Sequence, residues 1–191
     1  MKTIIQTEKS FLKTVEFTDI DLIKNVVEEI SDKLIHNPKI IVYGHECHQR
    51  RSVGFFSETS IGYFYSGQLA KSMPLLPSTK KLLESINSLF GAEFNGILVN
   101  KYMDGNDTIG AHSDDEKNLD TIGVVAISWG AIRKFRIRDK VTRKIVKDIL
   151  TEPGNIIHMG GDFQKEFTHE IPVEKKVKGC RYSFTFRRHL I

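Results

Sequence analysis

Three residues of metal-binding types could meet at one site. His112 and Asp114 stand two positions apart in IGAHSDDE, so on an extended segment their side chains leave the same face. His169, in the later strand-like run EFTHEIPV, could supply a third ligand if both segments fold into a common barrel. Two imidazoles and one carboxylate on one side of an ion leave further positions open, as in non-haem Fe(II) centres. The alternative is a histidine at a surface turn beside an acidic loop, with no metal.

The last strand-like run, residues 181–187, predicts an anion site. On a strand, Arg181 and Arg187 share one face. Burying a guanidinium without a partner is costly, and a dicarboxylate would supply one carboxylate to each arginine. Asn100 and Tyr102, two positions apart, could add hydrogen bonds to the same ligand. The alternative is that both arginines are surface residues of a terminal strand.

Positive charge gathers in one segment, although the net charge of the chain is only +4. Residues 133–147 carry eight Lys or Arg against the single Asp139. Within this segment Lys134, Arg136 and Arg138 alternate with apolar residues, so a strand here has one cationic face and one buried face. A polyanion could bind to the cationic face. The alternative is a solvated face that only keeps the protein soluble.

Strands must carry these residues, and helices must cover the strands. An apolar stripe with helical spacing predicts an amphipathic helix over 19–35, and a second helix follows Pro77 and ends near Gly91. From residue 95 onward the chain contains short β-rich runs: GILVNKY, TIGAHS, TIGVVAISW, KFRIR, KIVKDIL, GNIIHM, THEIPV and GCRYSFTFRR. The sequence therefore predicts an α+β fold in which two N-terminal helices buttress a β-sandwich or jelly-roll barrel.

Length and composition indicate one folded domain over residues 1–191. Hydrophobic residues make up 40% and charged residues 27%, which excludes a disordered chain. No apolar run is long enough to cross a membrane, and charged residues interrupt the start of the chain, so we expect an intracellular protein with no membrane partner. Cys47 and Cys180 are far apart, which predicts free thiols and excludes a cysteine-based metal site.

The order and spacing of these motifs resemble the AlkB family of Fe(II)/2-oxoglutarate-dependent dioxygenases. The likeness covers residues 40–188 and is greatest for the DNA-repair branch typified by the vertebrate nuclear homologue. It is carried by NKYMDGNDTIGAHSDDE, SWGA and RYSFTFR. The resemblance implies a double-stranded β-helix (jelly-roll) barrel that binds Fe(II) and uses 2-oxoglutarate and O₂ as cosubstrates.

The resemblance also assigns roles to the motif residues. The implied iron ligands and catalytic residues are His112, Asp114 and His169. The implied 2-oxoglutarate ligands are Asn100, Tyr102, Arg181, Ser183 and Arg187. Arg181 and Tyr102 would grip the distal carboxylate, while Arg187 and Asn100 would lie near the keto-acid end.

A nucleotide-recognition lid over residues 40–70 is a further implication. Tyr43 matches an aromatic finger that enters a duplex and fills the gap left by a flipped base, and Arg51 lies near it. Around the flipped base, the resemblance places Tyr63, Tyr65, Asp115 and Glu116. The base would stack between Tyr65 and His112. For each tyrosine, the alternative is an ordinary core or loop aromatic residue.

Two positions depart from the family pattern. Ser183 stands where many members have Asn, which removes an amide near the cosubstrate. Arg50 stands where a proline commonly precedes the basic loop residue, so the lid is expected to differ in shape. Neither change touches the implied iron ligands, but both bear on the preferred lesion.

The implied activity is oxidative demethylation of N-alkylated nucleobases in DNA, such as 1-methyladenine and 3-methylcytosine, with release of formaldehyde. Asp115 and Glu116 would favour a cationic alkylated base over a neutral one. Lys134, Arg136 and Arg138 would hold backbone phosphates of single- or double-stranded DNA. We expect a monomer, located in the nucleus of a eukaryotic source and in the cytoplasm otherwise.

Other functions remain open. An RNA demethylase or a hydroxylase of another substrate would use the same iron site. A non-catalytic β-barrel that binds nucleic acid would leave all three ligands and both arginines without a role.

Overall fold

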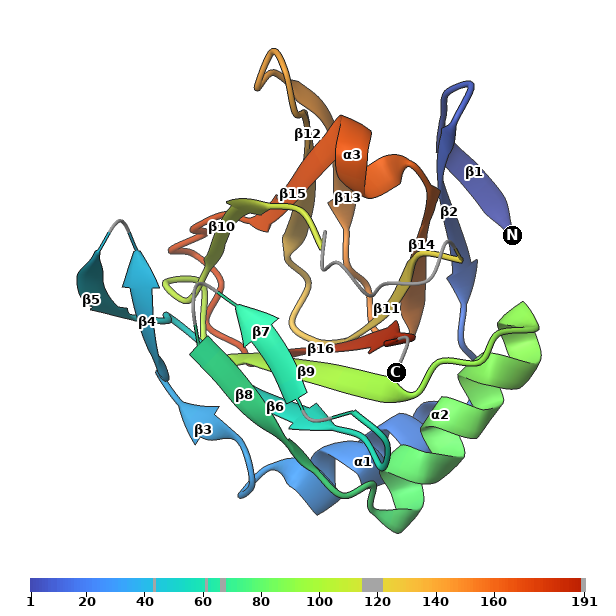
Figure 1. Cartoon of the computed structure of the whole chain (residues 1–191), viewed down its shortest axis with the longest axis vertical. Helices are drawn as coiled ribbons and strands as arrows, with labels where there is room; N and C mark the ends of the chain where they lie inside the picture. The colour runs from blue at the N-terminus through green and yellow to red at the C-terminus, as the bar shows by residue number, and fades with distance from the viewer. Residues whose placement is uncertain (43, 61, 66–67, 115–121, 190–191) are drawn as a thin grey trace.

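Two β-sheets face each other and form the body of the protein in the computed structural model, which describes residues 1–42, 44–60, 62–65, 68–114 and 122–189 (Figure 1). The larger sheet contains, in spatial order, β1 (Lys2–Gln6), β2 (Ser10–Glu16), β14 (Asn155–Gly161), β11 (Val124–Gly130), β16 (Arg181–Arg187), β9 (Gly96–Tyr102), β6 (Ser52–Phe56), β8 (Gln68–Met73) and β7 (Gly62–Tyr65), with β3 (Ile35–His36) paired to β6. The smaller sheet contains β10 (Ile109–His112), β15 (Phe167–Ile171), β12 (Lys134–Asp139) and β13 (Ile145–Leu150). A separate hairpin pairs β4 (Lys39–Val42) with β5 (His45–His48).

Two helices cover the outer face of the larger sheet (Figure 1). Helix α1 (Ile20–Ile30) begins where the Asp19 side chain accepts a hydrogen bond from the backbone of Leu22, and its apolar stripe is buried. Helix α2 (Pro77–Phe90) starts at a proline and ends at Gly91, whose φ of 58° places it in the left-handed region. Neither of these helices, nor any other in the described part of the chain, has the length and apolar character needed to cross a bilayer.

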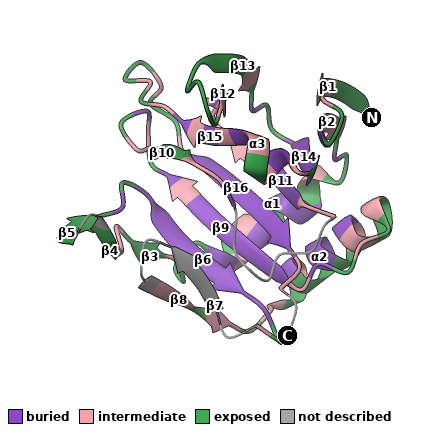
Figure 2. Ribbon diagram, turned by 45° about the horizontal axis from the view of Figure 1, so that its top comes forward, coloured by how far each residue is buried: buried purple, intermediate pink, exposed green. Residues whose placement is uncertain are grey.

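Side chains along the central strands point alternately to the two faces of the larger sheet. One face packs in the apolar core under the helices, and the other lines the pocket. On β16, Tyr182, Phe184 and Phe186 belong to the apolar core that the helices cover. The alternate residues of β16 point to the opposite face, toward the smaller sheet, as the period of two requires. A second apolar cluster fills part of the space between the sheets. All seven residues of β16 are buried, so its arginines are not surface residues (Figure 2).

The structure confirms the expected α+β jelly-roll class, and every β-rich run expected after residue 95 contains a strand. Both helices are present, but α1 ends at Ile30 rather than at 35, because residues 31–33 form a turn. Strands β1 to β8 were not predicted. Strand β1, for example, is short and largely exposed at the sheet edge, so its sequence lacks a clear apolar alternation.

The segment expected to form the lid, residues 40–70, contains both buried and exposed strands. Strand β6 is buried at every position and lies between β9 and β8 in the larger sheet, so residues 52–56 are core. The β4–β5 hairpin, in contrast, stands apart from both sheets, and the side chains of β5 are exposed (Figure 2). The lid role of residues 40–70 stays a prediction.

A side chain of α1 caps α2, which yields a stability prediction. Both carboxylate oxygens of Glu29 accept hydrogen bonds from the backbone N–H of Ser78, at 3.0 and 3.1 Å, and one also accepts from Thr79 at 3.0 Å. An anion at a helix N-terminus is favourable, so Glu29→Gln should lower the free energy of unfolding by about 1 kcal/mol. Urea denaturation measures this change. Glu28→Gln, at the exposed neighbouring position, should have almost no effect, and equal effects would refute the cap.

Candidate active site

The two candidate histidine ligands face each other across one strand pair. His112 on β10 and His169 on β15 are direct cross-strand partners, and their ring centroids lie 4.4 Å apart. The His169 ring also stacks on Phe135 of β12 at 5.1 Å, which holds its plane. Strand pairing within the smaller sheet therefore brings together residues that are distant in sequence.

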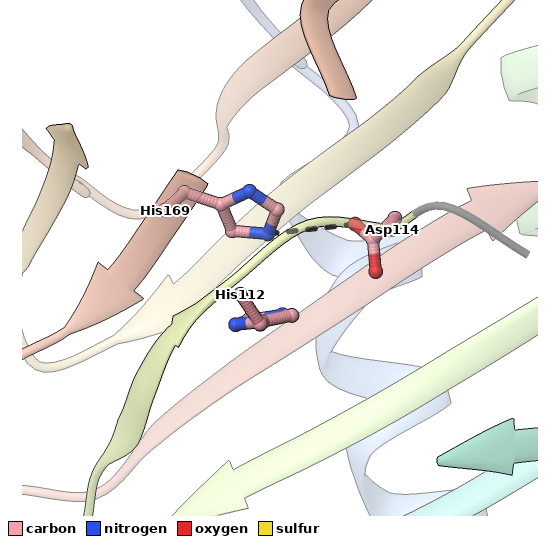
Figure 3. A group of neighbouring side chains, drawn as sticks. All are labelled: His112, Asp114 and His169. Carbon is pink, nitrogen blue, oxygen red and sulfur yellow. Dashed lines mark ion pairs between the residues drawn. The ribbon is translucent and has the colours of Figure 1, made fainter. Parts of the chain in front are cut away.

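Asp114 completes the group just beyond the end of β10. Its Oδ2 lies 3.4 Å from Nε2 of His169 (Figure 3). Its Oδ1 lies 3.2 Å from Nη2 of Arg187. Burial by itself would raise the pKa of Asp114, but Arg187 and the two histidines outweigh burial and hold this pKa well below its usual range. The carboxyl group is therefore ionised at neutral pH.

The protonation state of His112 suits metal binding. Burial, followed by the neighbouring His169, lowers the pKa of His112 to about 3, so the imidazole is neutral at pH 7. Its Nδ1 lies 2.9 Å from the backbone oxygen of Gly110. The carbonyl can only accept, so Nδ1 carries the proton and Nε2 is the nitrogen suited to a metal.

The donor set fits a non-haem iron. The ligand atoms of His112, Asp114 and His169 all lie within 4.8 Å of one another, and the three side chains converge (Figure 3). Two imidazoles and one carboxylate are the ligands of the facial triad that binds Fe(II) and leaves positions open for other ligands.

The opposite end of the site contains a buried cation. Arg181 is only 3% exposed, and its Nε and Nη2 donate hydrogen bonds to the hydroxyl groups of Thr151 at 3.0 Å and Ser128 at 2.9 Å. Its Nη1 is buried and makes no hydrogen bond within the described residues. Burial lowers the pKa of Arg181 to about 10, so it remains charged at neutral pH. This donor is oriented for an anion that enters the pocket.

The strand register brings the N-x-Y and arginine motifs side by side. On neighbouring strands β9 and β16, Tyr102 pairs with Arg181, and Asn100 pairs with Ser183. The Arg181 guanidinium lies 5.4 Å from the centre of the Tyr102 ring. Asn100 accepts a hydrogen bond of 2.8 Å from Nε of Arg51. The alternate residues of two strands thus form one continuous wall.

One pocket between the sheets contains most of the residues expected at the site. The expected residues that line it are Arg51, Asn100, Tyr102, His112, Asp114, His169, Arg181, Ser183 and Arg187. Tyr43, Asp115 and Glu116 lie outside the described residues. Tyr63 and Tyr65 belong to β7, and their side chains are also outside the described part.

The expected cationic face is present on β12, but its charge is partly compensated. Arg136 makes a bidentate pair with Asp148, with both bonds at 2.8 Å, and Arg138 binds Glu170 at 2.8 Å. These pairs reduce the positive charge available to phosphates. Their role in phosphate binding, like that of Lys134, stays a prediction.

Sequence reasoning missed Arg133, a buried arginine whose guanidinium lies 5.8 Å from the centre of the Tyr102 ring. It is 1% exposed and donates to the backbone oxygens of Asp104, Asp107 and Pro172 at 2.8 to 2.9 Å, and to Glu174 at 3.2 Å. In the sequence, Arg133 is one of eight basic residues in the segment 133–147, and nothing there distinguishes it from the others. Its acceptors lie on two other loops, which no local pattern reveals.

Comparisons with known proteins agree with this geometry. A family model described as the 2OG-Fe(II) oxygenase superfamily matches residues 11–187. The chain is 30% identical to the DNA oxidative demethylase ALKBH2 of Bos taurus, over 80% of this chain and 58% of the relative. It is also 30% identical to ALKBH2 of Homo sapiens, over 80% of this chain and 62% of the relative. This chain thus spans about three fifths of the length of these relatives.

A solved structure, that of OsALKBH1, has a similar fold. It matches with a TM-score of 0.59 and 16% identity, over 93% of this chain and 97% of that chain. At this identity the match supports the jelly-roll architecture alone.

Proposed function

Since this chain belongs to the 2OG-Fe(II) oxygenase superfamily and to its AlkB family, we propose that it removes methyl groups from N-alkylated bases of DNA, such as 1-methyladenine and 3-methylcytosine. The observation that carries the proposal is the pocket between the sheets. It combines a two-histidine, one-carboxylate group with a buried arginine whose Nη1 makes no hydrogen bond to the described part of the chain. The similarity to relatives named DNA oxidative demethylase supports the choice of substrate.

Different residues of the pocket would bind the metal ion and the cosubstrate. His112, Asp114 and His169 would hold Fe(II), which when bound would supply the oxidation that converts O₂, 2-oxoglutarate and the methyl group to succinate, CO₂ and a hydroxymethyl group. Arg181 would bind the distal carboxylate of 2-oxoglutarate through its fork of N–H donors. The hydroxymethyl group then leaves the base nitrogen as formaldehyde, and the parent base is restored.

The other end of 2-oxoglutarate would lie near Arg187 and Asn100. Arg187 is fully buried and contacts Asp114, so it holds positive charge beside the metal ligands. Asn100 accepts from Arg51, which is also buried and lines the pocket. This contact supports a role for Arg51 in shaping the wall between cosubstrate and base, rather than as a mobile lid residue.

The resemblance supports the remaining substrate roles. We propose that Tyr65 stacks on the flipped base and that Asp115 and Glu116 favour its positive charge. Tyr63 would border the same base. With DNA as the proposed substrate, the protein would act as a monomer, in the nucleus of a eukaryotic source and in the cytoplasm otherwise.

Release of formaldehyde from methylated oligonucleotides tests the function. Single- and double-stranded DNA with one 1-methyladenine, each with and without 2-oxoglutarate, should yield formaldehyde only in the complete reactions. Matched RNA oligomers identify an RNA demethylase if they react faster than DNA. No formaldehyde from any oligomer would refute the proposal. A visible absorption band with anaerobic Fe(II) and 2-oxoglutarate would then indicate a hydroxylase of another substrate, and its absence a binding module.

The proposed wedge gives a separate prediction. Tyr43 lies between β4 and β5 in sequence, and the exposed side chains of His45 to His48 follow it. Because opening a duplex costs a few kcal/mol that a single strand never requires, Tyr43→Ala should slow repair of double-stranded DNA much more than repair of single-stranded DNA. Initial rates on both substrates measure this. Equal losses, together with a lower melting temperature, would show that Tyr43 is a packing residue.

A further inference from the structure

A short helix holds the backbone of the carboxylate ligand. Helix α3 (Phe163–Glu166) connects β14 to β15, and the side chain of Gln164 points back to the end of β10. The backbone N–H of Asp114 donates a hydrogen bond of 2.9 Å to Oε1 of Gln164. Sequence reasoning assigned no role to Gln164.

The segment that carries Asp114 needs such a contact. Strand β10 ends at His112, so residues 113 and 114 lie beyond the ladder that pairs β10 with β15. Besides the bond to Gln164, this segment is held by Ser113, whose hydroxyl donates to the backbone oxygen of Phe167 at 2.9 Å. Two side-chain hydrogen bonds therefore replace the backbone ladder where the carboxylate ligand must be fixed.

The orientation of the Gln164 amide is defined on both sides. An N–H group can only donate, so the atom that faces Asp114 must be Oε1. The amide nitrogen, Nε2, then lies 3.8 Å from Sδ of Met159, a buried residue that lines the pocket. A neutral amide thus supplies one acceptor to Asp114 without adding charge beside the metal ligands.

Helix α3 is itself a firm support, although it is only one turn long. Phe163 is fully buried and packs on Phe167, with ring centroids 4.9 Å apart. Glu166 accepts a hydrogen bond of 2.8 Å from Thr7 in the β1–β2 turn. From the β12–β13 turn, Lys140 donates to the backbone oxygen of Gln164 at 3.0 Å. Contacts from two other hairpins therefore fix the position of Gln164.

We propose that Gln164 is a positioning residue of the metal centre, which sets the carboxylate of Asp114 against His112 and His169 through the Asp114 backbone. Outer contacts of this kind orient ligands that the metal would otherwise have to order on binding, and their loss costs about 10- to 100-fold in metal affinity. The proposal rests on the Fe(II) site of the family and is independent of which substrate is demethylated.

Metal affinity of substitution variants tests the proposal without any nucleic acid. Co(II) serves as an air-stable probe, and its dissociation constant is measured by titration of the visible absorption of the full chain. Gln164→Met keeps the size but loses the acceptor, and Gln164→Asn is too short to reach Asp114. Both should bind Co(II) about 10- to 100-fold more weakly. Gln164→Glu keeps an acceptor at full length and should bind within about threefold of the original protein.

A control on the same helix separates positioning from general stability. Lys165 is exposed and its Nζ pairs with Asp162 at 2.8 Å, away from Asp114, so Lys165→Met should leave the Co(II) affinity unchanged. Urea denaturation of each metal-free variant reports folding. Unchanged affinity in Gln164→Met and Gln164→Asn would overturn the proposal, as would equal weakness in Gln164→Glu. Because no oligonucleotide is present, failure here is distinct from failure of the demethylation assay.

Discussion

Replacement of Asp114 by alanine should abolish turnover and bound metal together. Asp114 is the only anionic member of the candidate ligand group, and its carboxylate lies 3.4 Å from His169. Two neutral imidazoles alone bind a divalent ion weakly, and the carboxylate also balances part of its charge. Formaldehyde release and iron content of the purified variant are the two measurements. An Asp114→Ala protein that keeps both iron and activity would contradict the assigned site.

The same substitution should also destabilise the metal-free protein. Asp114 is 5% exposed and pairs with Arg187 at 3.2 Å, and breaking a buried pair typically costs about 3–5 kcal/mol. Since the pKa of Asp114 is depressed in the folded state, its stabilisation is present above the unfolded pKa of about 4 and is lost as the pH falls. The difference in unfolding free energy between the original protein and Asp114→Ala should therefore become smaller below about pH 4. Asp114→Asn, which keeps the volume, separates lost charge from lost packing.

The part of the site that follows strand alternation was predictable from sequence. Residues two apart on a strand share a face, so the grouping of Asn100 with Tyr102, and of Arg181 with Arg187, required no knowledge of the fold. The pairing of His112 with His169 is different. It depends on the register between β10 and β15, which only the folded sheet determines.

Residues that support the site through long-range contacts were not predictable. Gln164 lies in a helix of one turn, too short for any periodic pattern, and its partner is 50 positions away. The Thr151 hydroxyl accepts a hydrogen bond from Arg181, which is 30 positions away in sequence. Thr151 follows β13, an edge strand of the smaller sheet. Such contacts depend on how loops cross, and a single sequence contains no local signal for them.

The basic residues of the sequence predicted the cationic face of β12 but not the acidic residues that pair with it. The alternation of Arg136 and Arg138 with buried residues is correct. The acidic partners, Asp148 and Glu170, lie on the strands that flank β12, and cross-strand register brings them opposite the arginines. A basic run in sequence therefore indicates the positive charge of a strand, but the neighbouring strands determine how much of it stays available for phosphates.

Arg181→Lys should raise the apparent KM for 2-oxoglutarate by about tenfold or more, which corresponds to about 1.4 kcal/mol. A lysine keeps the charge but has no planar fork, and it cannot hold Thr151 and Ser128 while it also binds a carboxylate in two places. Because this contact lies at the opposite end of the pocket from the metal ligands, kcat at saturating 2-oxoglutarate should change much less than KM.

The control for this prediction is the same exchange at a surface pair. Arg188 binds Glu93 at 2.6 Å and lies outside the pocket, so Arg188→Lys should leave KM unchanged. Thermal unfolding with and without 2-oxoglutarate, in the presence of Mn(II), gives a second readout: the cosubstrate should stabilise the original protein more than Arg181→Lys at equal concentration. If KM and this stabilisation both stay unchanged, the buried arginine binds something other than the cosubstrate. The Nη1 of Arg181 would then need a different anion, because no carboxylate of the described chain pairs with it.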